Sequence, residues 1–253
     1  MNISEIVKGL PPTRKIYLED SYARKADAEV LRVVKEKGKR YYLVLDSSLF
    51  HPLSGGQASD KGWLYHEDYR FEVKKVLENS NIVVIYGKIE EGRPPKEGDK
   101  VIQELDWERR YLIMRLHTAG HVIDRAVTEI LGVHVNTLGA LHGPPEAYVE
   151  YTAEISPNVL SDIERVSNEI LDDREVVIKE VPSSQLHQVV YGAPNLGRLP
   201  DVPVFRVVEV SGINAIPCSG THVRRTSEIG KILLKRVEKI EGGSRLYYWV
   251  SNR

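Results

Sequence analysis

The sequence of 253 residues has a single cysteine, no long apolar run and almost no net charge. One cysteine cannot form an intramolecular disulfide, which excludes the framework of a small secreted protein and indicates a reducing compartment. No segment approaches the ~18 to 20 apolar residues of a membrane span, and the first twenty residues contain no signal-peptide core. We therefore expect a soluble cytoplasmic protein with no membrane partner, in which Cys218 needs an explanation of its own.

The charge balance leaves no global field that would attract nucleic acid. Lys and Arg number 35 and Asp and Glu 36, a formal net charge of −1, so any RNA contact has to come from a local patch. From Cys218 to Arg253 eight basic residues face three acidic ones, a charge of +5, which leaves −6 for the remainder. With 42% hydrophobic and 28% charged residues the chain should fold, into one or two domains.

The first hundred residues read mostly as short strands. Tyr41–Leu45, Phe71–Leu77 and Ile82–Tyr86 are β-branched, aromatic or alternating. Only Asp27–Lys37 departs from this pattern, and Ser47–Tyr65 is rich enough in Gly, Pro and small polar residues for one long loop. We expect a β-rich, barrel-like N-terminal domain with a glycine-rich loop, residues 1–104.

A helical pattern follows and opens the second expected domain, residues 105–253. Apolar residues recur at spacings of three and four from Trp107 to Leu131, and Gly132 suits the left-handed position that ends a helix. Helical segments are also expected from Ser156 to Asp172 and from Ser183 to Tyr191. The expected strands are Val133–Leu141, Ala147–Ala153, Glu175–Val181, Phe205–Val210, Gly230–Glu238 and Arg245–Val250. Segregated strands and helices predict an α+β fold built on an antiparallel sheet.

Two pairs of side chains have the spacing of metal ligands. His117 and His121 are four residues apart on the predicted helix and share one face, and Cys218 and His222 repeat that spacing in CSGTH. One thiolate with three imidazoles favours one zinc ion over magnesium or calcium. The alternative is a polar helix face beside a cysteine that fills apolar space.

The neighbouring residues exclude other zinc enzymes. Thr118 follows the first histidine where H-E-x-x-H metalloproteases need a glutamate base, and the C-x-x-C pair of nucleobase deaminases is absent. Gly55-Gly56-Gln57 invites comparison with peptide release factors, but nothing around these three residues supports it.

Longer runs of residues point to one family. The segments DWERRYLIMRLHTAGHV (Asp106–Val122) and CSGTHVRRTSEIGKI (Cys218–Ile232) resemble the editing domain of alanyl-tRNA synthetase and of the AlaX trans-editing proteins. LFHPLSGGQASDKGWL resembles the glycine-rich motif of the medium-length AlaX class. The resemblance implies a cytosolic zinc-dependent hydrolase for translation fidelity, which deacylates tRNA(Ala) mischarged with serine, and glycine is a second candidate substrate.

The resemblance also implies roles for individual residues. His117, His121, Cys218 and His222 would be the zinc ligands, and Thr137 stands where the family has a Gln or Thr that faces the aminoacyl group. Other residues placed at the substrate are Gly139, Gly220 and Thr221. Those expected at the tRNA are Arg109, Arg110, Arg224, Arg225, Gly55, Gly56 and Gln57. Ala140 replaces the serine of the family's Gly-Ser step, and Ser54 replaces the first of three glycines.

Several alternatives stay open. Four protein ligands close a tetrahedral site, whereas catalysis needs an open position, so His222 or His117 is expected to be movable and catalytic, or else zinc positions the substrate. Thr137 is a candidate partner for the serine hydroxyl, or simply a β-branched strand residue. The rival functions are a tRNA- or synthetase-binding module with structural zinc and the editing of Ser-tRNA(Thr). In GAPNLGRLPDVP, Arg198 and Asp201 could approach the site. The oligomeric state is open, and a homodimer is one option.

Overall fold

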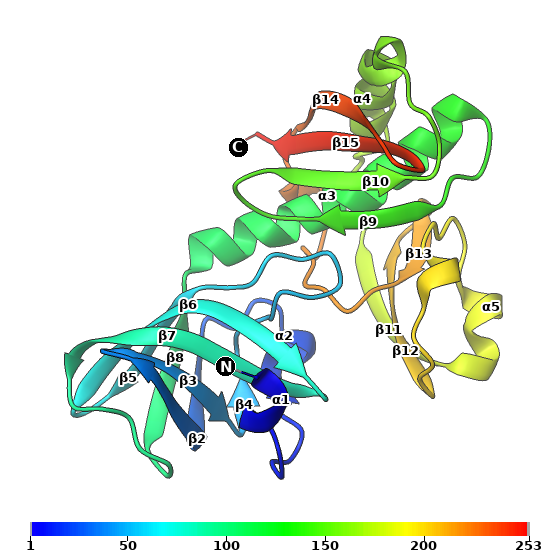
Figure 1. The fold of residues 1–253 in the computed structure, drawn as a ribbon. Helices are drawn as coiled ribbons and strands as arrows, with labels where there is room; N and C mark the ends of the chain where they lie inside the picture. Colours follow the sequence, from blue (N-terminus) through cyan, green and yellow to red (C-terminus); the bar gives the residue numbers. More distant parts are fainter. Residues whose placement is uncertain (1, 252–253) are drawn as a thin grey trace. The chain divides into compact units, whose positions relative to one another are not determined.

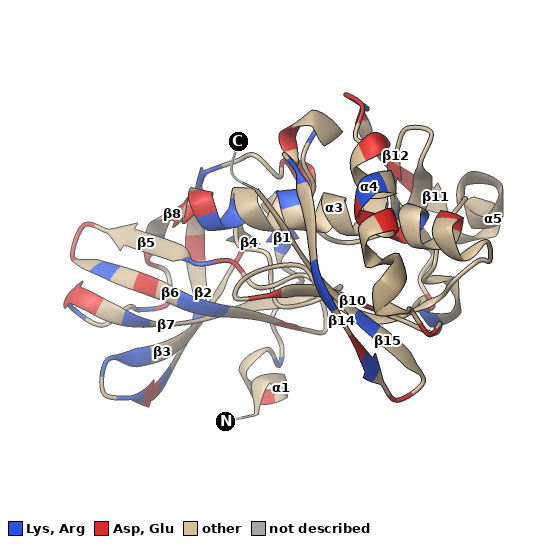
Figure 2. Ribbon diagram, turned by 90° about the horizontal axis from the view of Figure 1, so that it is seen from above, with Lys and Arg blue, Asp and Glu red and all other residues tan. Residues whose placement is uncertain are grey.

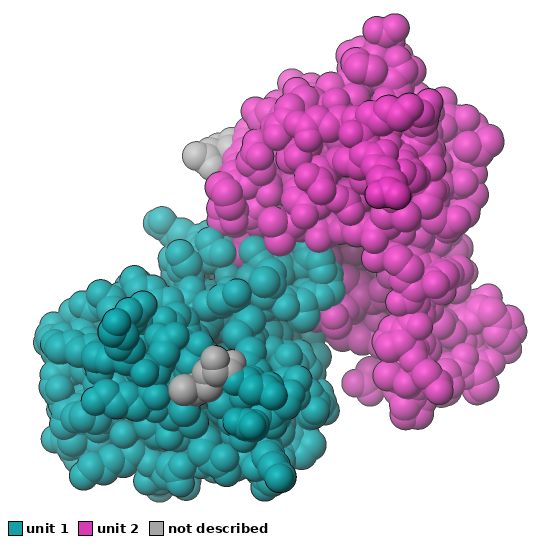
Figure 3. Space-filling view, viewed as in Figure 1, with its two compact units in different colours: residues 1–111 teal, residues 112–253 magenta. Residues whose placement is uncertain are grey.

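A computed structural model describes residues 2–251 (Figure 1) and divides into two compact units, Met1–Tyr111 and Leu112–Arg253 (Figure 3). The boundary expected near residue 104 lies inside the last strand of the first unit, β8 (Lys100–Leu105). A β-barrel followed by an α+β region confirms the expected fold class.

Six antiparallel strands close into a barrel in unit 1, in the order β2-β3-β7-β6-β5-β8. They are β2 (Lys25–Lys37), β3 (Arg40–Leu45), β5 (Gly62–His66), β6 (Tyr69–Asn79), β7 (Ile82–Gly92) and β8. Alternate residues such as Leu43, Leu64, Phe71 and Ile85 point inward and are fully buried. Closure leaves none of these strands with an unpaired edge.

Three details expected for this unit differ in the structure. Asp27–Lys37, which was expected not to be a strand, belongs to β2. The first half of β2 pairs with β8 and the second half with β3, and this pairing overrides the charged composition of the segment. The end of the presumed loop forms β5, and β7 continues through Gly87. A Cβ at Gly62 would clash with the carbonyl oxygen of Glu104, so this glycine permits close approach of two strands.

The remaining elements of unit 1 are short. They are α1 (Ile3–Ile6), α2 (Ile16–Glu19), and the parallel pair β1 (Arg14–Lys15) and β4 (Ser47–Ser48).

A buried ion pair anchors the far end of the glycine-rich loop. Arg110 is fully buried and Asp60 is 1% exposed. The Arg110 Nε lies 3.1 Å from both carboxylate oxygens, and its other nitrogens donate to the carbonyls of Ser21 (3.0 Å) and Leu49 (2.8 Å). Asp60 also accepts from the backbone N–H of His51 (2.6 Å). Both charges are thus satisfied by partners that are themselves fixed.

Unit 2 combines two antiparallel sheets with helices. The four-stranded sheet has the order β14-β15-β10-β9 and the three-stranded sheet the order β11-β12-β13. The strands are β9 (Thr137–Leu141), β10 (Ala147–Tyr151), β11 (Val176–Pro182), β12 (Val204–Val210), β13 (Asn214–Pro217), β14 (Ile232–Ile240) and β15 (Gly243–Val250). The helices are α3 (Trp107–Leu131), whose first turn belongs to unit 1, η1 (Pro157–Val159), α4 (Leu160–Glu169), η2 (Ser183–Gln185), α5 (Leu186–Val189), η3 (Leu196–Arg198) and η4 (Thr226–Glu228).

The long helix is the most accurately predicted element. α3 has the expected bounds, and Gly132 follows it with φ +67°. The strand expected from Val133 starts only at Thr137, the helix from Ser156 ends at Glu169, and β13 was not predicted. No helix within residues 2–251 is long and apolar enough to cross a membrane.

Arg110→Met should lower the free energy of unfolding by about 3–5 kcal/mol, because it leaves the Asp60 carboxylate buried without its counter-charge. Urea unfolding followed by circular dichroism measures the change. The double variant Arg110→Met/Asp60→Leu removes both charges and should recover much of the loss; a double variant less stable than the single one would contradict this account.

Candidate metal centre

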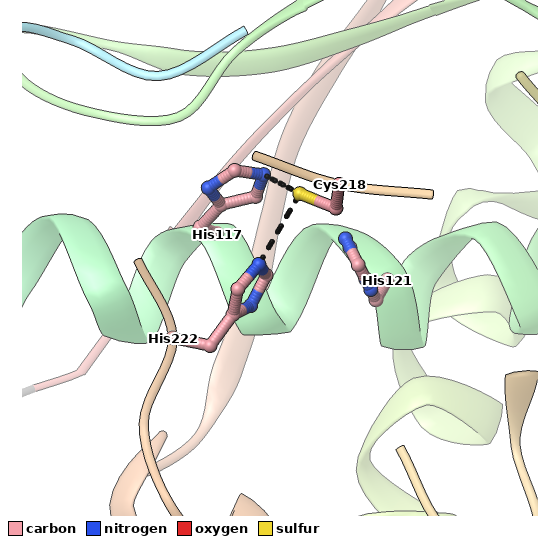
Figure 4. A group of neighbouring side chains, drawn as sticks. All are labelled: His117, His121, Cys218 and His222. Carbon is pink, nitrogen blue, oxygen red and sulfur yellow. Dashed lines mark hydrogen bonds between the residues drawn. The ribbon is translucent and has the colours of Figure 1, made fainter. Parts of the chain in front are cut away.

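The two pairs of predicted ligands meet at one point in unit 2 (Figure 4). α3 supplies His117 and His121, and the segment after β13 supplies Cys218 and His222. The candidate ligand atoms all lie within 4.8 Å of one another. The three imidazoles are at most 4% exposed, and Cys218 is partly exposed.

The geometry and the donor set fit a zinc ion. The Cys218 Sγ lies 3.4 Å from Nε2 of His117 and 3.3 Å from Nε2 of His222. Sulfur and nitrogen ligands of one tetrahedral zinc are about 3.5 Å apart, given metal–ligand distances near 2.3 and 2.0 Å. The Nδ1 of His121 is buried without a hydrogen-bond partner among the described residues. The group can therefore hold a metal ion.

Thr118 fixes the proton on His222. Its hydroxyl donates to the carbonyl of Met114 (2.9 Å), so its oxygen accepts from Nδ1 of His222 (3.1 Å) and from the backbone N–H of Val223 (3.3 Å). With the proton on Nδ1, the Nε2 lone pair of His222 faces Cys218. The residue that replaces the glutamate of metalloproteases thus orients a ligand.

His142, which the sequence analysis did not single out, covers the ring of His117. The two rings stack with centroids 4.3 Å apart. The Tyr248 hydroxyl donates to the carbonyl of Leu116 (2.9 Å), so Nδ1 of His142 donates to that hydroxyl (2.5 Å). A Cβ at Gly120 would lie 2.5 Å from Cε1 of His142. Nothing in the sequence singles out His142, because no second histidine or cysteine stands at ligand spacing from it. Gly120, between His117 and His121, leaves the space that the His142 ring occupies.

Burial sets the protonation of this group. It lowers the pKa of His121 to about 3, with a smaller contribution from Arg206, and it lowers the pKa of His142 to about 3. Both rings are therefore neutral near pH 7, the form in which imidazole binds metals. Burial raises the pKa of the Cys218 thiol, so a metal ion would have to displace its proton.

Thr137 opens β9 and is 8% exposed. Its hydroxyl donates to the carbonyl of Pro194 (3.3 Å) and accepts from Nη2 of Arg198 (2.8 Å). Arg198 therefore reaches the predicted substrate residue, whereas Asp201 is exposed and forms no side-chain hydrogen bond or ion pair within residues 2–251.

The buried carboxyl group of Asp124 lies on α3 and contacts the strand next to Thr137. Thr137 pairs across the sheet with Tyr151, whose hydroxyl donates to Oδ1 of Asp124 (2.7 Å), one helical turn after His121. Burial raises the pKa of Asp124 to about 7, although the Tyr151 hydrogen bond and the Arg198 charge both lower it. Tyr151 thus links Asp124 of α3 to the strand β10, which pairs with β9 at Thr137.

The other residues predicted at the substrate have backbone or packing roles in this structure. Gly139 pairs with Glu150, and a Cβ there would meet Oε2 of that side chain at 2.6 Å. The N–H of Gly220 donates to Sγ of Cys218 (3.5 Å), and its carbonyl accepts from Arg206 (2.9 Å). Thr221 is fully buried. Their roles at the substrate stay predictions.

Two residues predicted at the tRNA are inside the protein. Arg110 is committed to Asp60 and backbone carbonyls, so its guanidinium cannot reach a phosphate, and that prediction is wrong for this structure. The Gln57 side chain is also fully buried. Gly55 (φ +57°) and Gly56 (φ +73°) form a turn closed by the Gln57 N–H to the Ser54 carbonyl (2.9 Å), which requires glycine-like conformations.

The remaining predicted contacts are closer to the surface. Arg109 is half-buried, and its Nε donates to the Ser59 carbonyl (3.1 Å). Arg224 and Arg225 are exposed. Within the described part of the basic C-terminal segment, ion pairs join Arg225 to Asp173, Arg236 to Glu146 and Glu238, Lys239 to Glu154, and Arg245 to Glu150. Much of the +5 charge is therefore balanced locally.

Known proteins match both ends of the chain. Residues 17–109 match the family model of class II (A) tRNA synthetases, and residues 205–247, which contain Cys218 and His222, match the threonyl and alanyl tRNA synthetase second additional domain. Alanine–tRNA ligases of Metallosphaera sedula and Sulfurisphaera tokodaii are 38% and 35% identical over 94% and 96% of the chain, and that of Pyrobaculum calidifontis is 34% identical over 94%. The chain spans 26% of the length of each of these ligases.

Thr118→Val should weaken zinc binding by about 10- to 100-fold, because His222 loses the acceptor that holds its ring and its proton. Competition with a chromogenic chelator measures the affinity. Thr118→Ser keeps the hydroxyl and serves as the matched control. Equal affinities for the valine variant and the native chain would show that Thr118 does not orient His222.

Proposed function

Since the chain is homologous to the editing region of alanyl-tRNA synthetase, as the AlaX proteins are, we propose that it is a zinc-dependent aminoacyl-tRNA hydrolase. Its substrate is tRNA(Ala) mischarged with serine, with glycine as a second substrate, and it acts in the cytoplasm. The observation that carries the proposal is the buried group of His117, His121, Cys218 and His222 in a chain related to alanine–tRNA ligases over nearly its whole length.

Zinc at this group would supply Lewis-acid chemistry, by acidifying a bound water or by polarising the ester carbonyl. The residues of the chain decide which ligand can yield a coordination position. His222 is held by Thr118, and His117 is covered by His142. His121 has a ring nitrogen with no partner among the described residues. Thr118 and His142 would hold His222 and His117 in position, so the yielding position is assigned to His121, in place of the expected His117 or His222.

Thr137 is the proposed discriminator of the side chain. Its proton is committed to the Pro194 carbonyl and one lone pair to Arg198, so a second lone pair is left to accept the hydroxyl of serine. Alanine has no donor and would leave this acceptor unsatisfied, which costs about 1–3 kcal/mol. Arg198 keeps the hydroxyl oriented and is thus part of the proposed specificity.

Two alternatives remain distinct from this proposal. A binding module with a structural zinc would use the same four ligands in a closed site. Editing of Ser-tRNA(Thr) is suggested by the family model, which covers both threonyl and alanyl synthetases. The three relatives described above match over nearly the whole chain and are alanine–tRNA ligases, which favours tRNA(Ala).

The purified protein should release serine from Ser-tRNA(Ala) much faster than alanine from Ala-tRNA(Ala). Chelation should abolish this release because it removes the metal, and added Zn²⁺ should then restore activity. Cys218→Ala should also abolish release, because the site loses its only thiolate, and added Zn²⁺ should not restore it. Radiolabelled deacylation assays on both esters, with Gly-tRNA(Ala) and Ser-tRNA(Thr) in parallel, measure the rates. Tight tRNA binding without turnover of any ester would support the binding module instead.

Thr137→Val should slow serine release by about ten-fold or more and change glycine release less, because only serine offers a hydroxyl to this position. The ratio of kcat/KM for the two esters is the measurement. Thr137→Ser retains the hydroxyl and should keep the native ratio. Equal losses for serine and glycine in the valine variant would assign Thr137 a purely structural role.

A further inference from the structure

The outer face of the barrel has a hollow of about 670 Å³ that none of the predicted site residues lines. It lies over β3, β7 and β6, beside the turn between β2 and β3. Its lining consists of Lys37, Gly38, Lys39, Arg40, Lys74, Tyr86, Gly87 and Lys88. Five of these eight residues are cationic, in a chain whose net charge is −1. Figure 2 shows Lys and Arg positions on these strands in blue.

The strand register brings like charges together. Arg40 on β3 is the direct cross-strand partner of Lys88 on β7, an arrangement that costs stability in a sheet. On β6 the register shifts between Val73 and Lys75, so Lys74 is an extra residue opposite β7. Bulges of this kind re-aim a side chain. The pairing of β3 with β7 and the bulge on β6 thus both place cations at the hollow.

Gly87 forms part of the floor of the hollow. A Cβ there would clash with the carbonyl oxygen of Glu72 and with the ring of Phe71. The glycine therefore lets β6 approach β7 closely at the bulge. The hollow and the position of Lys74 follow from the same backbone feature.

The cations are only partly neutralised. Glu36 lies 3.6 Å from Arg40, Glu72 contacts Lys74 and lies 3.6 Å from Lys88, and Glu90 lies 2.6 Å from Lys88. Lys37 and Lys39 have no ion pair within residues 2–251 and are exposed. Five cations against three carboxylates leave a formal charge of +2. Exposed ion pairs are weak, so a phosphate can displace these carboxylates at little cost.

We propose that this hollow binds the phosphodiester backbone of RNA, and thereby holds the tRNA that the proposed function requires. Long cationic side chains spread over three strands and a turn match a chain of phosphates, each of which needs only a local positive charge. Of the other predicted RNA contacts, Arg110 is unavailable because it is buried and paired with Asp60.

The test compares two triple variants with the same change in charge. Lys37→Gln/Lys39→Gln/Lys74→Gln removes cations from the hollow; Lys25→Gln/Lys96→Gln/Lys100→Gln removes exposed cations near the opposite end of β2. The first should raise the Kd for uncharged tRNA about ten-fold or more at 0.1 M salt and reduce the slope of log Kd against log salt by about 2. The second should change both much less.

Further measurements separate this proposal from the proposed hydrolase. With Ser-tRNA(Ala), the hollow variant should raise KM and keep kcat, because it leaves the metal centre intact. If no variant or native chain deacylates any ester but the hollow variant still loses tRNA binding, the hydrolase fails and the RNA surface stands. Equal Kd values for the two triple variants would overturn the RNA surface. So would complete displacement of tRNA from the native chain by millimolar inorganic phosphate at constant ionic strength, which would indicate a small-anion site.

Discussion

Three buried imidazoles converge on the partly exposed Cys218 in unit 2, and the degree of burial decides how these groups are protonated. Burial holds His121 and His142 neutral, which suits metal binding, but it also opposes ionisation of Cys218. A divalent ion reverses the second effect, because coordination replaces the thiol proton. Metal binding and the packing of this unit are therefore expected to be strongly coupled.

The three residues between His117 and His121 each make a different contact around the candidate metal centre. Thr118 accepts the proton of His222, Ala119 is fully buried in the core, and Gly120 leaves room for His142. None of them is a ligand. A short run of small side chains thus lets α3 face the sheet, the ligand segment and a covering ring at once, which larger residues at these positions would prevent.

Local patterns were predicted well and long-range ones were not. The bounds of α3 and the convergence of its histidines follow from a helical period that the sequence displays directly. β2 was not recognised, because its strand conformation comes from two partners distant in sequence. Gly62 was assigned to a loop, because the sequence does not distinguish a glycine in a turn from a glycine at a close contact between two strands. Arg110 was placed at RNA because its charge is visible in the sequence and its partner Asp60, fifty residues earlier, is not identifiable there.

The separation of the two ligand pairs along the chain has a consequence for biosynthesis. Cys218 lies 101 residues after His117, so at about 5–20 residues per second roughly 5–20 s of translation separate the two ligands. During that interval the nascent polypeptide carries the two helix histidines without their thiolate partner. Metallation of the complete site is therefore an event of the end of synthesis or later, and the barrel, whose strands are all translated earlier, can fold before it.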